Sequence, residues 1–212
     1  ARGVVASASY EARKFGIRSA MPMKLAIQSC PKAVVVSPRF DRYRELSKQA
    51  MGIFHSLSAT VESLSLDEAY LDITERVTHT QTPRRIALQL KARVKSKLGL
   101  VISVGVGTSK SVSKIASDMG KPDGLVVVYP NSERNFLAPL PVQKLPGVGP
   151  KTSLRLVAGG VHTIGDLSSR GEGWLQSRLG KLGPHLRLLA LGHDVRPVRI
   201  VREAKSISSE TT

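Results

Sequence analysis

The sequence contains a single cysteine, Cys30, among its 212 residues. One thiol cannot build an internal disulfide framework, and no histidine accompanies it in "IQSCPKA" to suggest a zinc site. We expect Cys30 to be a buried, inert thiol. The sequence also lacks an apolar run of about 18 residues and a signal-peptide pattern, so we predict no membrane span and a cytoplasmic protein.

Acidic residues are scarce: 16 Asp and Glu stand against 32 Lys and Arg, which gives a formal charge of +16 and a pI near 10.5. The excess is spread along the chain and is not packed into one tail. Such a balance indicates a polyanionic partner, nucleic acid first. The hydrophobic content of 41% excludes disorder of the whole chain, because it can bury a core in one or two compact domains.

The hydrophobic pattern predicts an α+β fold followed by helices alone. We expect short strands in "GVVASAS" and "KAVVVSP" and short helices in "YEARKFG" and "PMKLAIQS". A helix with one apolar face over 40–57 should lie on a sheet formed by "ATVESLS", "AYLDIT", "LVISVGVGTS" and "GLVVVYP", with helices in "RRIALQLKARVKSKL" and "SKSVSKIASDM". Beyond Pro130 the expected helical core consists of Leu156, Val157, Ile164, Leu167, Leu175, Leu179, Leu186 and Leu189, with Trp174 packed there.

The stretch "SLSLDEAYLDI" places two adjacent carboxylates, Asp67 and Glu68, where a hairpin between two strands should turn. Water can solvate such a pair, and that interpretation stays open. The flanks belong to a buried sheet, however, and like charges at its edge repel one another unless a cation lies beside them. Carboxylate oxygens suit Mg²⁺. In a basic protein with a polyphosphate partner, two such ions about 4 Å apart would assist phosphoryl transfer.

The stretch "LPGVGPKT" carries a pattern typical of a helix-hairpin-helix loop. Gly147 and Gly149 permit a tight turn with outward backbone N–H groups, which bind phosphate at a helix N-terminus. Pro150 suits the first turn of the next helix, and Lys151 can add a phosphate contact. A plain interhelical turn is the alternative.

Two basic stretches stand out, and the first of them could hold a triphosphate. In "YEARKFG", Tyr10, Arg13 and the next lysine lie on or near one face of a short helix, where they could hold phosphates or be solvated. In "ASDMGKPDG", Lys121 lies in a turn before a strand, and a plain surface turn is the alternative. On the helix before it, we expect Lys110 and Lys114 to form a solvated face with some electrostatic reach to DNA.

Four motifs, "YEARKFGIRSAMP", "SLDEAYLDI", "SVGVGTSKSVSKIASDMGKPDG" and "LPGVGPKT", follow one another in the order found in the Y-family, or translesion, DNA polymerases. The chain resembles the DinB (polymerase IV) branch of that family over nearly its whole length. The resemblance implies a ferredoxin-like palm sheet with helices on one face, small fingers and a helical thumb with a helix-hairpin-helix loop. It would assign residues 1–38 to the fingers, 39–128 to the palm, 129–195 to the thumb and 196–212 to a linker or the start of a further domain.

The resemblance also implies an activity: template-directed addition of deoxynucleotides to a primer 3′-hydroxyl, at low fidelity, in the bypass of damaged template during DNA repair. Two Mg²⁺ ions would be the cofactor, and primer–template DNA and deoxynucleoside triphosphates would be the partners. Ser7 and Ala8 would line a roomy pocket for the nascent base pair. The implied site residues are Asp67 and Glu68 for metal binding and catalysis, Ser7, Tyr10, Arg13 and Lys121 for the nucleotide, and Gly147, Gly149 and Lys151 for DNA.

Some parts of the family pattern have no counterpart in the 212 residues. They are the first palm strand, with a further metal-binding Asp and an aromatic residue that screens the sugar 2′-hydroxyl, and the little-finger domain. We therefore interpret the chain as a fragment that is inactive alone, and a sliding clamp as a partner stays open, since it would bind further C-terminal residues. Two other functions stay open: a nucleotidyl cyclase-like palm enzyme, which would not need "LPGVGPKT", and a non-catalytic DNA-binding module.

Overall fold

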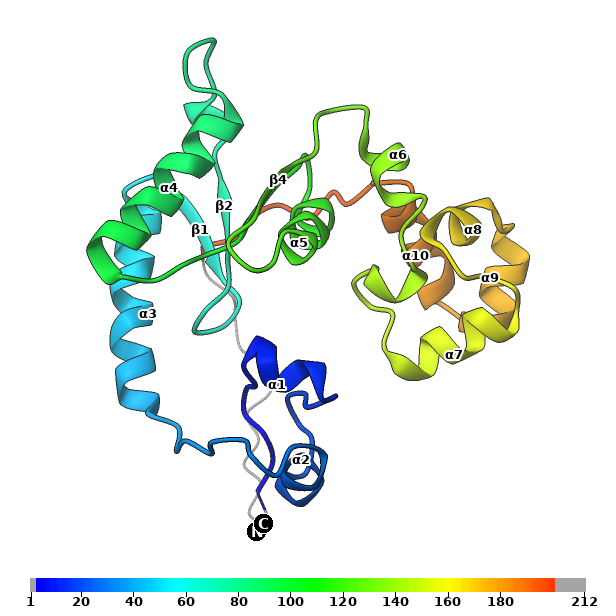
Figure 1. The fold of residues 1–212 in the computed structure, drawn as a ribbon. Coiled ribbons are helices and arrows are strands. Elements are labelled where there is room, and N and C mark those ends of the chain that lie inside the picture. The colour runs from blue at the N-terminus through cyan, green and yellow to red at the C-terminus, as the bar shows by residue number, and fades with distance from the viewer. Residues whose placement is uncertain (1–2, 201–212) are drawn as a thin grey trace. The chain divides into compact units, whose positions relative to one another are not determined.

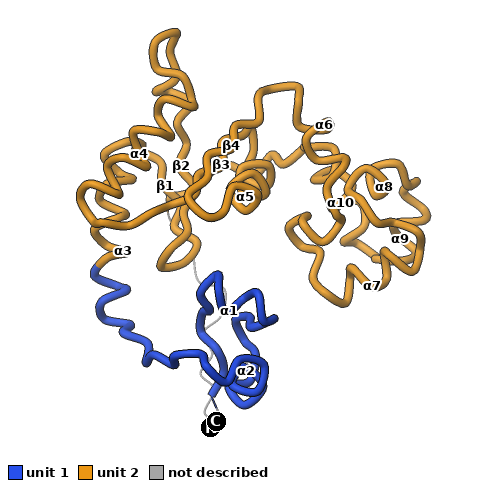
Figure 2. Tube along the Cα trace, viewed as in Figure 1, with its two compact units in different colours: residues 1–45 blue, residues 46–212 orange. Residues whose placement is uncertain are grey.

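The structure is a computed structural model that describes residues 3–200. The chain divides into two compact units, residues 1–45 and 46–212 (Figure 2). The part of the predicted linker beyond residue 200 lies outside the described residues. None of the helices in the described range has the length and apolar character that crossing a membrane requires.

The first unit contains the two predicted short helices, α1 (Tyr10–Lys14) and α2 (Met23–Ser29) (Figure 1). Helix α1 begins after Ser9, whose side chain accepts a hydrogen bond from the Ala12 N–H at 3.2 Å and so satisfies one free donor of the first turn. A small core of buried Val5, Ile17 and Ala26 joins the helices to the preceding segment, and Cys30 packs against this core partly buried.

Both strands predicted in the first unit are wrong. The stretch "GVVASAS" contributes only an isolated bridge between Val4 and Pro22. Residues 33–39 form neither helix nor strand, and Val34 is 87% exposed there. β-branched residues favour a pleated, half-buried surface, and no described strand offers residues 33–39 such a surface.

The second unit contains the predicted hairpin, with β1 (Thr60–Ser63) antiparallel to β2 (Ala69–Asp72). Strands β3 (Val104–Val106) and β4 (Leu125–Val127) are parallel, and helix α5 (Lys110–Met119) connects them as a βαβ unit. The fold class is therefore α+β, as predicted. The single expected sheet, however, consists of two separate two-stranded ladders in the described residues.

Helices α3 (Phe40–His55) and α4 (Pro83–Leu98) cover one side of these ladders (Figure 1). Helix α4 begins after Thr82, whose side chain accepts from the Arg85 N–H, and ends at Gly99 with φ of 67°. A 3₁₀ turn, η1 (Thr74–Arg76), lies between β2 and α4. One core holds both ladders. Its buried residues come from α3, the turn after it, β1 and α4: Ile53, Phe54, Leu57, Val61, Leu90 and Val94. Leu71 of β2 and Val104 of β3 are partly buried and pack against them.

Helix α5 lies directly on β3 at Gly105. A Cβ atom added at Gly105 would lie 2.0 Å from the Ser113 carbonyl oxygen and 2.3 Å from the Ser117 nitrogen. Only glycine permits this close approach of helix and strand backbones. The contact fixes the position of α5, whose buried Val112 and Ile115 join the core of the helices that follow.

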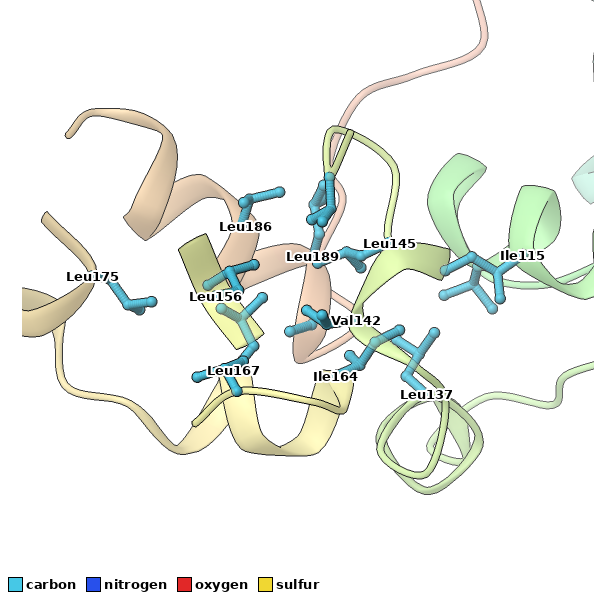
Figure 3. Packing of buried hydrophobic residues seen from close by; sticks show 14 of the residues in the cluster. Ile115, Leu137, Val142, Leu145, Leu156, Ile164, Leu167, Leu175, Leu186 and Leu189 are labelled. Atoms are coloured by element: carbon cyan, nitrogen blue, oxygen red, sulfur yellow. The ribbon is translucent and has the colours of Figure 1, made fainter. Parts of the chain in front are cut away.

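The remaining helices form the all-helical part that the composition beyond Pro130 predicts (Figure 1). Their core is drawn in Figure 3, and the predicted positions Val157 and Leu179 are only partly buried. Trp174 packs against the core as predicted. The elements are α6 (Glu133–Leu137), η2 (Val142–Lys144), α7 (Pro150–Ala158), α8 (Ile164–Ser169), α9 (Glu172–Leu179) and α10 (Leu182–Ala190).

Candidate functional site

The two adjacent carboxylates lie at the turn of the β1–β2 hairpin, as predicted. The last paired residues are Ser63 and Ala69, so Asp67 and Glu68 belong to the short loop between the strands. Asp67 is exposed and accepts a hydrogen bond from the Ser65 hydroxyl at 2.7 Å. The Glu68 side chain is 37% exposed and forms an ion pair with Lys114 of α5. One carboxylate thus faces solvent, and the other already has a cation beside it.

Helix α5 presents a second lysine to the hairpin one turn earlier. Lys110 Nζ lies 2.8 Å from Glu62 Oε2 of β1, and the two side chains are only 11% and 10% exposed. The prediction that Lys110 and Lys114 form a solvated face is therefore wrong. Both lysines neutralise carboxylates that lie 46 to 48 positions earlier in the chain. Residue spacing in the sequence cannot predict a contact at such a separation.

The segment after α10 returns to the same region. The Arg199 backbone N–H donates to Glu62 Oε2 at 2.9 Å, and the Ser111 N–H in the first turn of α5 donates to Asp194 at 3.1 Å. Burial raises the pKa of Asp194, but the hydrogen bonds and charge of Arg196 outweigh burial and lower it to about 2. Asp194 is thus a charged anchor for the N-terminus of α5, and nothing in the sequence pattern predicted it.

Tyr70 lies on β2 beside these charges. Burial raises the pKa of its hydroxyl, and the neighbouring carboxylates add to this, while Arg196 opposes it. The Lys110 ammonium lies 5.6 Å from the centre of the Tyr70 ring, within the range of a cation–π contact. The phenol therefore stays protonated at neutral pH.

The hairpin carboxylates fit part of a divalent-cation site. Among residues 3–200 no three His, Cys, Asp or Glu side chains gather as a potential metal site. Asp72 on β2 is engaged elsewhere, because it accepts hydrogen bonds from the Thr74 N–H and hydroxyl at 2.9 and 2.6 Å, which lower its pKa. Mg²⁺ is commonly held by one or two carboxylates together with waters and substrate phosphates. Asp67 and Glu68 match that minimal donor set.

The candidate nucleotide residues of the first unit lie close together. The Arg13 guanidinium lies 4.9 Å from the centre of the Tyr10 ring, and Arg13 Nε donates to the Ala8 carbonyl at 3.0 Å. Ser7 is exposed just before α1. Lys121 belongs to the second unit, in the turn between α5 and β4, where its ammonium lies 2.6 Å from Asp118 of α5.

The loop at 145–152 has the backbone that its glycines predict. Gly147 has φ of +94°, a left-handed conformation that favours glycine. Gly149 precedes α7 as its N-cap, and Pro150 is the first helical residue. Val148 is buried between the two exposed glycines and fixes the loop to the core. Lys151 is exposed at the start of α7, where the first backbone N–H groups have no acceptor within the helix.

An α+β body with a carboxylate-bearing hairpin, followed by helices that carry a glycine-rich loop, fits the palm-and-thumb architecture of polymerases. The chain belongs to the impB/mucB/samB family, whose pattern it matches over residues 1–118. Residues 130–161 match the helix-hairpin-helix motif of the same family, described as the IMS family HHH motif. The resemblance to Y-family polymerases is therefore confirmed.

Individual relatives agree with this assignment. The chain is 45% identical over its whole length to a DNA polymerase IV from Ralstonia nicotianae and 46% identical to one from Halorhodospira halophila, and it spans 59% of each. A crystal structure of DinB from Sulfolobus solfataricus superposes with a TM-score of 0.86 at 33% identity, covering 92% of this chain and 58% of that one. An insertion ternary complex of Dbh DNA polymerase gives 0.85, also at 33% identity, with 93% and 58% covered.

Proposed function

We propose that the chain is the catalytic part of a translesion DNA polymerase, which adds deoxynucleotides to a primer 3′-hydroxyl opposite a template. The observation that carries this proposal is the pair of adjacent carboxylates at the turn of the β1–β2 hairpin, Asp67 exposed and Glu68 partly exposed, in a family whose relatives are named DNA polymerases. The fingers would comprise residues 1–38, the palm 39–128 and the thumb 129–195, with 196–212 as a linker.

In this proposal Asp67 and Glu68 hold Mg²⁺, which supplies charge neutralisation and activates the attacking hydroxyl when bound. Tyr10 and Arg13 contact the phosphates of the incoming deoxynucleoside triphosphate, and Lys121 adds positive charge near its leaving group. Small residues at 7 and 8 leave room beside the nascent base pair, which favours tolerance of damaged template at the expense of fidelity.

The thumb loop is proposed to grip the primer–template backbone. Gly147, Gly149 and Lys151 present backbone N–H groups and a cation at the start of α7, which suits phosphate and reads no bases. Binding by this +16 chain should therefore be independent of sequence and should weaken steeply as salt rises. Fluorescence anisotropy with labelled primer–template duplexes of different sequence, at several salt concentrations, measures both properties. Affinity that does not change with salt would contradict the phosphate contacts.

The activity itself can be tested in an enzyme completed with the flanking segments of the Ralstonia nicotianae relative. We expect Mg²⁺-dependent extension of a primer on a template, including past a damaged base, and no conversion of nucleoside triphosphates to cyclic nucleotides. The helix-hairpin-helix match supports this choice over a cyclase-like enzyme. A completed protein that binds primer–template DNA but never extends it would instead favour the non-catalytic DNA-binding module.

A further inference from the structure

Lys114 of helix α5 forms an ion pair with Glu68, which is one of the two candidate metal ligands. Lys114 lies one turn after Lys110 on α5, so both side chains project from the same face of the helix toward the hairpin. Lys110 already forms an ion pair with Glu62, in which Nζ lies 2.8 Å from Oε2. Of these two lysines, Lys114 is therefore the one that pairs with a candidate metal ligand.

Three contacts fix α5 and therefore fix where Lys114 can reach. The helix backbone lies on Gly105 without room for a Cβ atom. The pair of Lys110 and Glu62 is nearly excluded from solvent, and Asp194 accepts from the first turn of the helix through the Ser111 N–H. Buried pairs of this kind hold their partners tightly, because separating them leaves an uncompensated charge. The position of Lys114 beside Glu68 is therefore fixed by the packing of α5.

An ammonium and a divalent ion compete for the same carboxylate oxygens. Two adjacent carboxylates repel one another when no cation is near, and the ion pair with Lys114 offsets that repulsion by placing a positive charge beside Glu68. A divalent ion that uses Glu68 must displace the ammonium and also tolerate its positive charge nearby. The Lys114 side chain is 29% exposed, so it can turn toward solvent when it is displaced.

We propose that Lys114 is an internal counter-ion of Glu68 that competes with a divalent ion for this carboxylate, so that this lysine lowers the affinity of the carboxylate pair for metal. The inference rests on the proposed metal site and adds a residue that controls it. Removing the charge of Lys114 should tighten metal binding, by roughly threefold to tenfold, because a competing ion pair and a repulsive charge are lost together.

The test uses the 212-residue chain and Mn²⁺, whose free concentration is measured by electron paramagnetic resonance during titration. Mn²⁺ is bound by the same oxygen ligands as Mg²⁺. Lys114→Met should bind Mn²⁺ more tightly than the unaltered chain. Lys114→Arg, which keeps the charge, should bind it about as the unaltered chain does. Lys144→Met removes one exposed lysine from η2 in the helical part, and it should leave the affinity unchanged.

The outcomes separate this inference from the proposed function. Unchanged or weaker Mn²⁺ binding by Lys114→Met, with a circular dichroism spectrum equal to that of the unaltered chain, overturns the competition. If Lys114→Met unfolds, Lys114→Gln takes its place with the same expectation. A double Asp67→Ala, Glu68→Ala variant should lose the Mn²⁺ binding that Lys114→Met strengthens. If that double variant binds Mn²⁺ as before, the metal site itself is misplaced and the proposed function loses its basis along with this inference.

Discussion

Replacing Asp194 by Asn should destabilise residues 46–212, because this carboxylate ties the segment after α10 to the N-terminus of α5. The Asp194 side chain is 1% exposed. It accepts hydrogen bonds from the Ser111 N–H at 3.1 Å and from Arg196 Nε at 2.6 Å. Asn has nearly the same shape, but it removes the negative charge that strengthens both bonds.

The magnitude follows from the pKa of Asp194, which falls from an ordinary value of 3.8 to about 2. Because the pKa is lower in the folded state, the carboxylate stabilises the fold above about pH 4, and this stabilisation is lost as the pH falls toward 2. The difference corresponds to roughly 2.4 kcal/mol at pH 7. Arg196 is half exposed, and solvent screening of its charge reduces the expected loss to roughly 1.5–2 kcal/mol.

Urea unfolding, followed by the fluorescence of the single tryptophan in α9, measures this loss as a change in the free energy of unfolding. At pH 3 the difference between Asp194→Asn and the unaltered chain should shrink to about half its value at pH 7. The matched control is Glu172→Gln, which neutralises a carboxylate that is 73% exposed and 3.7 Å from Arg187. It should change the stability by less than about 0.5 kcal/mol. An equal loss for Asp194→Asn at both pH values, or no loss at pH 7, would refute the reasoning.

Three further predictions test other parts of the structure. Replacing Gly147 and Gly149 together by Val should weaken duplex binding in anisotropy measurements and leave the far-ultraviolet circular dichroism spectrum intact; unchanged affinity would remove the loop from the DNA interface. In the completed enzyme, Arg13→Ala and Lys121→Ala should each raise KM for the incoming nucleotide, while affinity for primer–template stays nearly constant; a fall in DNA affinity instead would assign them to the duplex. Gly105→Ala should lower the free energy of thermal unfolding by roughly 3 kcal/mol, because its methyl group would overlap the α5 backbone, and a stable variant would mean that α5 can move.

The sequence predicts most elements of this fold because their limits are encoded locally. Thr82 and Pro83 begin α4 and Gly99 ends it, and Pro150 begins α7, as capping rules anticipate. Local signals mislead where a strand depends on a distant partner. The three valines at 34–36 have the composition of a strand, but no ladder forms there among the described residues.

The candidate site was likewise predictable only where its residues are close in the sequence. The hairpin that carries Asp67 and Glu68 could be predicted, because alternating apolar residues flank a turn within a few positions. The cations that face it could not, because the pair of Glu68 and Lys114 joins residues 46 positions apart. The contact between Ser111 and Asp194 joins residues 83 positions apart and uses a backbone N–H. Such contacts depend on how the ladders and α5 pack, which composition and spacing do not encode.

The most direct test of the central claim is primer extension by the completed enzyme with Asp67→Ala or Glu68→Ala, measured beside its affinity for primer–template DNA. We predict that either change abolishes Mg²⁺-dependent extension and leaves the DNA bound, because the variant loses a metal ligand and also a negative charge that repels the polyanion. Full extension by the double Asp67→Ala, Glu68→Ala variant would show that the pair is a solvated turn and that the active site lies elsewhere.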